Sequence, residues 1–400
     1  MLSNSAHAPG GAARDHRRYL LMAGIALAYV ACIPLSNGDV REHLLHWTAY
    51  LIEHGRFAAL GTNFSEYAPP YLYLLAMSTW LAPSIGELAV IKLVSIAGTL
   101  FLAGCMRWLL AGCTDPATAR RGALLTLCLP TVVANGPVWG QCDALYTGCA
   151  LLAVGAVMRG RVVPAMLAAG VAVAFKLQGV FVAPLMLAVV LAARGRWWTM
   201  IVPPIAYAAM MLPAWIAGRP VRDLALLYLA QGAYFHDLAR SVPNIWQLLR
   251  AVAPGFPYGA GVAIGLVLAA TAAVLIALAA RRALDAPRRV LLVALAGAVL
   301  LPYLLPKMHE RYFFMADVLA FAYALAAPSR RARWIATLVQ VASLLAYATF
   351  LVHLTGGAFV GALVMTGALV LVVREFAASV APLGTGVPFL APRRRGALGA

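Results

Sequence analysis

Long apolar runs follow one another along almost the whole chain, most of them separated only by short polar turns. This succession limits the possible folds more than any other feature of the sequence. A run of roughly 20 apolar residues can cross a bilayer as a helix, and lipid offers no partners to an open sheet. About twelve such runs can be recognised by this criterion. They occupy residues 19–36, 88–106, 122–136, 143–158, 162–175, 177–193, 197–217, 258–280, 289–305, 310–327, 334–353 and 357–373.

The composition excludes a soluble globular protein. The chain is 63% hydrophobic and 11% charged, whereas about a quarter of a soluble domain is normally charged. The net charge of +17 would suggest nucleic acid in a soluble protein, but here the arginines lie between apolar runs, as topological anchors do. The six cysteines are scattered without ligand spacing, so we expect neither a disulfide framework nor a zinc site. The sequence predicts an all-α polytopic membrane protein with no nucleic-acid partner.

Charge placement predicts the topology. Arg14, Arg17 and Arg18 precede the first run, which favours a cytoplasmic N-terminus. Residues 70–82 have a short, proline-bounded apolar core, so we expect an interfacial or re-entrant helix there. With that segment not crossing, the arginines of every later turn fall on the cytoplasmic side. The predicted parts are two cytoplasmic tails (1–18 and 374–400), two membrane modules (19–217 and 258–373) and two long outer loops (37–87 and 218–257).

The stretch NGDVREHLLHW, residues 37–47, begins the first outer loop. If it is helical, one face carries Asp39, His43, Trp47, Tyr50 and His54 at helical spacing, an ionisable surface beside an aromatic one. Asp39 followed by Glu42 also resembles a capping box, which would make Asp39 a plain helix cap. Both interpretations remain open at this point, and one side chain can serve both roles.

Further polar clusters are expected on the same outer face. A single Lys or His at a membrane edge is usually an anchor that reaches for the interface. Several clusters on one side instead offer a carboxylate base together with a cationic phosphate site. The candidates are Gln141, Asp143 and Tyr146 in GPVWGQCDALYT; Lys176 and Gln178 in AFKLQGVFVAPL; Lys307, His309, Glu310 and Arg311 in LLPKMHERYFF; and, as acceptor or loop candidates, His43, Trp47, Glu66, Tyr67, His236, Asp237, Arg240, Asn244 and Trp246.

Six stretches, in this order over about residues 19 to 315, resemble the signature stretches of the GT-C membrane glycosyltransferases. They are NGDVREHLLHW, EYAPPYLYLL, GQCDALYTG, FKLQGVFVAPL, SVPNIW and PKMHERYFF. The most similar pattern is that of the dolichyl-phosphate-glucose glucosyltransferases and their bacterial polyprenyl-phosphate-sugar relatives. The resemblance implies a GT-C-type helical bundle, with Asp39 as the general base and His309, Glu310 and Arg311 in the donor site. It implies a polyprenyl-phosphate sugar as donor substrate and no certain cofactor. The sequence differs from the eukaryotic pattern at GQCDALY, so the resemblance does not define the sugar.

The predicted reaction is the inverting transfer of a sugar, with a hexose such as mannose or glucose expected, from the lipid carrier. The acceptor is a lipid-linked glycan, a protein or a wall polymer on the extracytoplasmic face of a bacterial inner membrane. The sequence predicts no metal ligands and leaves a divalent metal open. A transporter or flippase of a lipid-linked sugar is the alternative. Transporters place ionisable groups near the bilayer midplane and often show paired repeats, whereas here the polar groups gather on one side and no internal repeat is visible.

The topology can be tested by cysteine labelling. In a variant without the six native cysteines, we expect a cysteine placed in the 281–289 turn to be protected from a membrane-impermeant thiol reagent in intact cells. A cysteine in the 218–257 loop should react. Labelling of the turn without labelling of the loop would reverse the orientation.

Overall fold

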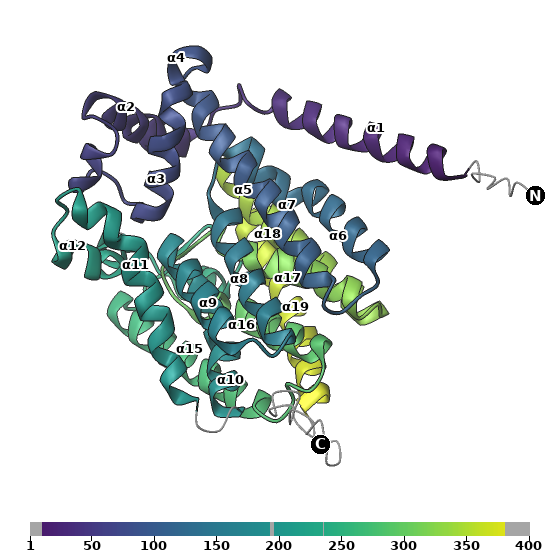
Figure 1. Ribbon diagram of the computed structural model, residues 1–400. Helices are drawn as coiled ribbons and strands as arrows, with labels where there is room; N and C mark the ends of the chain where they lie inside the picture. The colour runs from purple at the N-terminus through teal and green to yellow at the C-terminus, as the bar shows by residue number, and fades with distance from the viewer. Residues whose placement is uncertain (1–9, 193–195, 235, 381–400) are drawn as a thin grey trace, which may run out of the picture.

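The computed structural model describes residues 10–192, 196–234 and 236–380 and is almost entirely helical (Figure 1). The all-α prediction is confirmed. Six segments are long and apolar enough to cross a membrane, or seven if one bent helix pair counts as a single span. The six are α5 (Glu87–Leu110), η6–α11 (Trp197–Ile201 and Val202–Ile216), α15 (Tyr258–Ala280), α16 (Pro287–Leu304), α18 (Arg330–Leu351) and α19 (Gly357–Val380).

The bent pair consists of α6 (Pro116–Cys128) followed by α7 (Pro130–Val133) and η4 (Ala134–Trp139), with a bend of 50°. Pro130 explains the break, because a proline disfavours helical backbone at the residue before it. Leu129 is accordingly extended, with φ −60° and ψ 128°. Within η4, Pro137 removes a further backbone donor and widens the helix locally to a π-turn.

The remaining predicted runs hold shorter apolar helices. They are α1 (Gly10–Ala31, apolar from Tyr19), α8 (Asp143–Met158), α9 (Val162–Phe175), η5–α10 (Leu177–Val182 and Ala183–Ala192) and α17 (Phe314–Ala326). Several helices do not end where the apolar runs end: α1 begins within the expected N-terminal tail, α17 begins four residues after position 310, and α19 continues to Val380. Each predicted run nevertheless contains an apolar helix or the bent pair.

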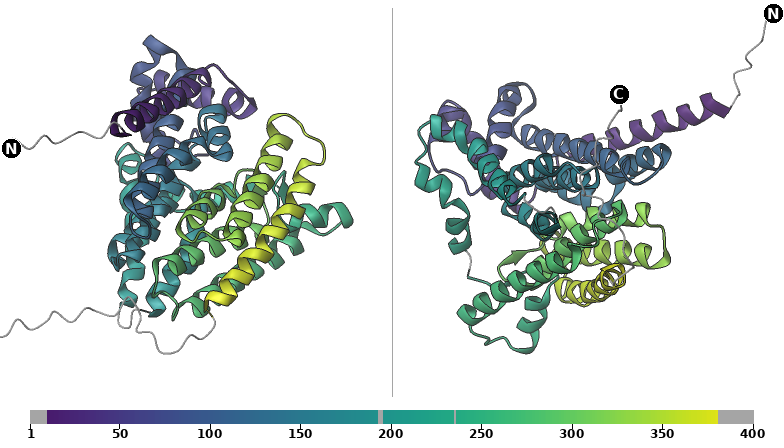
Figure 2. Two further views of the ribbon diagram at one scale, coloured as in Figure 1. Left: turned by 90° about the vertical axis from the view of Figure 1, so that its right-hand side faces the viewer. Right: turned by 60° about the horizontal axis from the view of Figure 1, so that its bottom comes forward.

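Early and late helices form two sides of the bundle. Figure 2 shows α18 and α19, in green to yellow, on one side and the early helices, in blue, on the other. Between them, α8 is buried over nearly its whole length. It packs against α5, α9, α16 and α17. A helix that is apolar on every face is expected at the centre of such a bundle.

The first outer loop forms a group of short helices beside one end of α5 (Figure 1). They are η1 (Val40–Leu44), α2 (Leu45–Glu53), η2 (Ala58–Gly61), α3 (Pro69–Ser78), η3 (Thr79–Leu81) and α4 (Ala82–Ile85). The 10 residues of α3 span about 15 Å, half of a hydrocarbon core. Because η3 and α4 follow α3 without a gap, residues 70–82 lie in one longer helical stretch, which is not among the six candidate spans. That these residues do not cross stays a prediction.

The second outer loop contains α12 (Val221–Ala225), α13 (Leu227–Tyr234), β1 (Ala239–Arg240) and α14 (Ile245–Val252). Strand β1 pairs in parallel with β2 (Met308–His309), so that Arg240 lies opposite His309. This short pairing joins the second outer loop to the segment between α16 and α17.

Two of the acceptor or loop candidates have structural roles in this loop. Asn244 accepts from two backbone amides at the start of α14, and its Nδ2 donates to the carbonyl oxygens of Pro302 at 3.3 Å and Leu305 at 3.2 Å. Trp246 is buried, and its Nε1 donates to the Leu304 carbonyl at 2.7 Å. Both side chains therefore hold α14 against the end of α16, and neither is presented to a substrate.

Candidate functional site

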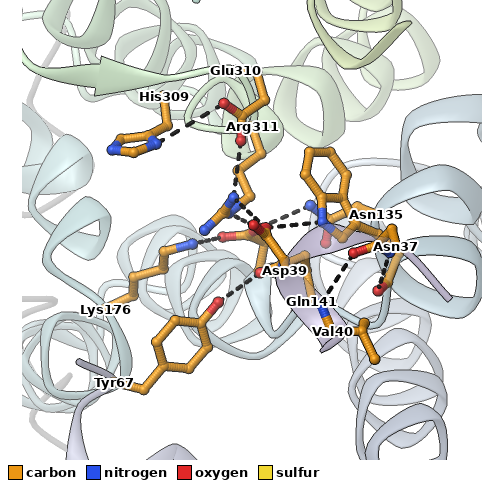
Figure 3. A network of polar contacts seen from close by, with 12 residues as sticks. Asn37, Asp39, Val40, Tyr67, Asn135, Gln141, Lys176, His309, Glu310 and Arg311 are labelled. Atoms are coloured by element: carbon orange, nitrogen blue, oxygen red, sulfur yellow. Dashed lines mark hydrogen bonds and ion pairs between the residues drawn. The ribbon is translucent and has the colours of Figure 1, made fainter. Parts of the chain in front are cut away.

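Polar side chains from four chain breaks meet in one cluster (Figure 3). One break lies between α1 and η1, the second between η4 and α8, the third between α9 and η5, and the fourth is the loop that joins α16 to α17. Backbone that leaves regular helix has free polar groups and can turn side chains inward. The positions of these breaks therefore place the cluster at one end of the bundle.

Asp39 is held by one of its two carboxylate oxygens. Its Oδ2 accepts hydrogen bonds from Trp139 Nε1 at 3.0 Å, Gln141 Nε2 at 3.1 Å and Arg311 Nη1 at 3.2 Å. The side chain keeps 21% of its exposure, so an incoming molecule can reach it. The carboxylate is therefore fixed in orientation and still accessible, which is the geometry that a general base needs.

The capping interpretation of Asp39 is wrong. Although Asp39 precedes η1, its side chain makes no capping hydrogen bond. Asn37 caps this helix instead, because its Oδ1 accepts a hydrogen bond from the Val40 amide at 3.2 Å. The Nδ2 of Asn37 also donates to the Trp139 carbonyl at 3.0 Å, which ties η1 to η4.

The η4–α8 junction aims Trp139 and Gln141 at Asp39. Gly140 between them has φ +89°, a conformation that glycine adopts readily and other residues rarely. The indole of Trp139 is buried and stacks on Phe350, with ring centroids 5.0 Å apart. Its orientation toward the carboxylate is therefore fixed by packing.

Asp143 was expected at the membrane surface but is fully buried. Its Oδ1 accepts from Lys176 Nζ and its Oδ2 from Asn135 Nδ2 at 2.8 Å, and Arg311 Nε lies 3.8 Å from Oδ2. Asp143 is also the first residue of α8, where the helix dipole favours a negative charge. The sequence shows that Asp143 precedes an apolar run, but it does not show that neighbouring helices bury this side chain.

Lys176 points inward because α9 ends just before it and its backbone becomes extended. Gly179 allows η5 to fold back on α9, since a Cβ there would lie 2.5 Å from backbone atoms of Ala172 and Val173. The Lys176 ammonium lies 5.8 Å from the Tyr146 ring centroid and 5.3 Å from that of Tyr312. These distances are within cation–π range.

Two other buried candidates in this region have polar atoms without hydrogen bonds in the described structure. Tyr146 is inaccessible and its hydroxyl has no partner there. Gln178 is 7% exposed, and its Oε1 likewise has none. Buried groups of this kind usually have a ligand or water as partner.

The loop before α17 brings three titratable residues to the cluster. Arg311 Nη1 lies 2.9 Å from Glu310 Oε1, and burial raises the pKa of the Glu310 carboxyl, only partly opposed by Arg311. Burial, and then the positive charges of Arg311, Arg240 and Lys176, lowers the pKa of His309 well below its usual value. His309 is therefore neutral at neutral pH. The positive charges that keep it neutral would stabilise an anion beside it.

Lys307 does not join this group. Its Nζ donates to the Gly232 carbonyl and lies 5.4 Å from the Tyr258 ring centroid. Its backbone has φ +62°, which turns the chain between Lys307 and β2. The expectation that Lys307 shares a phosphate site with His309 and Arg311 is not supported by this geometry.

The remaining loop candidates divide into two groups. Tyr67 belongs to the cluster, because its hydroxyl donates to Gln141 Oε1 at 2.6 Å. Trp47 packs on Tyr67 at 5.0 Å between centroids, and His43 on Trp47 at 5.8 Å. Glu66 is exposed, and its backbone carbonyl accepts a hydrogen bond from Gln231 Nε2.

His236 and Asp237 lie elsewhere. Both are exposed and line a cavity of about 190 Å³ between α14 and the start of α15. The His236 ring lies 5.6 Å from that of Tyr258. Within the described ranges, no three His, Cys, Asp or Glu residues gather as a metal-binding group.

Three functional residues were not singled out from the sequence: Asn37, Asn135 and Trp139. Asn37 and Trp139 lie inside the motifs NGDVREHLLHW and GPVWGQCDALYT, beside residues that were chosen. The signal that could have found Trp139 is the Pro137–Gly140 pair, which marks a break that turns neighbouring side chains inward.

No known protein family model matches the chain, and no curated protein does. Solved structures do match. The fold resembles that of ArnT from Cupriavidus metallidurans in the apo state, with a TM-score of 0.55 and 13% identity over 92% of this chain and 78% of that one. ArnT bound to undecaprenyl phosphate matches with a TM-score of 0.55 and 15% identity over 91% of this chain and 75% of that one. The chain thus shares the helical fold of these structures and is an integral membrane protein.

The buried Lys176–Asp143 pair gives a stability prediction. Lys176→Met should destabilise the purified protein by about 3–5 kcal/mol, because the buried Asp143 carboxylate loses its cationic partner. Adding Asp143→Asn should recover most of that loss. Thermal unfolding in detergent measures both variants.

Arg289→Met is the matched control, since Arg289 pairs with Asp285 in a more accessible i,i+4 contact of 2.7 Å. Such pairs contribute about 0.3–0.5 kcal/mol. Equal small effects at both positions would show that the Lys176–Asp143 pair is not a buried interaction in the protein.

Proposed function

We propose that the protein is a membrane glycosyltransferase that moves a sugar from a polyprenyl-phosphate carrier to an acceptor hydroxyl. One observation carries this proposal: the accessible carboxylate of Asp39 is fixed by three donors beside a site where positive charges converge. A base next to an anion-stabilising site is what transfer from a sugar phosphate requires. The fold supports it, because ArnT is a GT-C glycosyltransferase.

The donor is proposed from the position of the cationic groups and from the comparison. ArnT has been solved with undecaprenyl phosphate. In this chain the phosphate is proposed to bind beside His309, near Lys176 and Arg240, while the polyprenyl tail remains in lipid between helices. Arg311 is assigned a different role, since its guanidinium already contacts Asp39 and Glu310. Its charge holds the two carboxylates and adds to the field at the phosphate.

The reaction is an in-line displacement. The acceptor oxygen attacks the anomeric carbon, and Asp39 takes the proton of the acceptor hydroxyl as the new C–O bond forms. The bond between the anomeric carbon and the phosphate oxygen breaks, and its electron pair leaves with the phosphate. The leaving group is an anion, so it needs electrostatic stabilisation more than a proton donor. A single displacement inverts the anomeric configuration, by analogy with inverting hydrolases.

The finer assignments follow from the sequence. We propose a hexose, mannose or glucose, as the transferred sugar and a lipid-linked glycan, a protein or a wall polymer as the acceptor. We also propose that the protein belongs to a bacterial inner membrane and contributes to the cell envelope. The cluster then faces the periplasm, because the positive-inside rule puts the α1–η1 exit on the extracytoplasmic side.

One observation favours the transporter alternative. Asp317, in α17, is fully buried beside Ser343 and Thr131. An ionisable residue inside a membrane helix is by default a candidate for an ion or substrate path. The acidic residues of the cluster, in contrast to Asp317, lie at helix ends, where transfer from a lipid-phosphate sugar would occur. Transport without donor cleavage, lost in Asp317→Asn, would favour this second function.

The proposal predicts the effect of Asp39→Asn. The amide oxygen can keep the hydrogen bonds from Trp139, Gln141 and Arg311, so the fold should remain stable. The amide nitrogen cannot accept a proton, and general-base catalysis typically contributes a factor of 10²–10⁴. We therefore expect turnover to fall by roughly 10²–10⁴. The assay is release of undecaprenyl phosphate from undecaprenyl-phosphate mannose and glucose in membranes that contain the protein.

Glu42→Gln is the control, because Glu42 is exposed one turn further along the chain. It should retain most of the activity. If Asp39→Asn turns over either donor as fast as the wild type, Asp39 is not the base.

A further inference from the structure

We propose that Tyr67 and Gln141 are positioning residues that fix which oxygen of Asp39 takes the proton. The inference rests on the proposed function, since it concerns the orientation of the proposed base. Tyr67 comes from the first outer loop, and Gln141 from the junction between η4 and α8. Figure 3 shows Tyr67, Gln141 and Asp39 in a line of contacts that runs from the loop into the cluster.

The two oxygens of the Asp39 carboxylate have unequal surroundings. Oδ2 receives all three assigned hydrogen bonds, from Trp139, Gln141 and Arg311. No described residue donates to Oδ1. An oxygen that accepts three donors has no lone pair left for a proton. The acceptor hydroxyl must therefore deliver its proton to Oδ1.

The amide of Gln141 has only one orientation that satisfies both of its neighbours. An ionised carboxylate can only accept hydrogen bonds, so the group facing Asp39 Oδ2 must be the amide nitrogen. The amide oxygen then faces Tyr67, whose hydroxyl donates to it at 2.6 Å. Gln141 is 1% exposed, so without Tyr67 this oxygen would lack water as well as a protein donor. Tyr67 thereby keeps the donor end of Gln141 on Asp39.

Tyr67 is itself fixed by packing and by the second outer loop. Its ring lies between Trp47 and Tyr71, each with a centroid 5.0 Å away. The preceding residues are held from outside: Arg219 donates to Asn63 Oδ1, and Gln231 to the Glu66 carbonyl. Both outer loops therefore act on the base through one tyrosine hydroxyl.

A double-mutant cycle tests this chain of contacts. Turnover of undecaprenyl-phosphate mannose or glucose should fall about 3- to 10-fold in Tyr67→Phe, which loses one buried neutral hydrogen bond. It should fall about 10- to 100-fold in Gln141→Leu, which loses a donor to a charged group. If Tyr67 acts through Gln141, the double variant should be no slower than Gln141→Leu alone. Losses that multiply in the double variant, or full activity in Tyr67→Phe, would overturn the proposal.

The pH dependence separates positioning from general loosening. Removing a donor from a carboxylate favours its protonated form. In Gln141→Leu, which lacks that donor, the acid limb of kcat should therefore move to higher pH. In Tyr67→Phe it should move in the same direction by less, because Gln141 is then held less firmly with its amide nitrogen toward Asp39. KM for the donor should change little in either variant. A lower rate at every pH with an unmoved acid limb would indicate a merely structural role and would overturn the proposal.

Tyr71→Phe is the matched control. Tyr71 contacts Tyr67 and is fully buried, but its hydroxyl has no hydrogen-bond partner in the described structure. Its turnover and pH profile should equal those of the wild type. Failure of the proposed function would look different: the wild type would cleave neither donor, or Asp39→Asn would retain full activity.

Discussion

A single, largely buried guanidinium connects the helix ends that form the polar cluster. Arg311 lies within ion-pair distance of three carboxylates: Glu310 at 2.9 Å, Asp39 at 3.2 Å and Asp143 at 3.8 Å. It also lies 5.5 Å from the Trp139 ring centroid. These contacts join the end of α1, the start of α8 and the loop before α17, which are far apart in the sequence. Arginine suits this position because it stays charged and offers several fixed donors at once.

The charge balance around Arg311 explains the division of roles in the cluster. Three carboxylates face two largely buried cations, Arg311 and Lys176. Burial raises the pKa of Glu310, which favours the neutral, protonated form of this carboxyl. A neutral group can be buried at much lower cost than a charged one. Positive charge also acts on the side of His309, where burial and then the positive charges of Arg311, Arg240 and Lys176 lower the histidine pKa. The base and the proposed phosphate site are separated in this way although they share one cluster.

Much of the fold could be predicted because lipid imposes a simple rule on apolar runs. Each predicted run contains a helix or the bent pair, and residues 70–82 are helical as expected. The contacts within and around the cluster were harder to predict from the sequence. Lys307 and His309 are two residues apart, yet a turn of backbone at Lys307 sends their side chains to different neighbours. Asn244 and Trp246 looked like loop residues free for an acceptor, but they anchor α14, because the sequence does not show which carbonyls lie nearby.

In the proposed site, Arg311 holds the base while the phosphate binds on the His309 side of the cluster. A cryo-EM structure with undecaprenyl phosphate tests it most directly. We expect phosphate density within hydrogen-bonding reach of His309 and Lys176, with the Asp39–Arg311 contact retained. Phosphate bound to Arg311 in place of Asp39, or bound at Lys307, would contradict it.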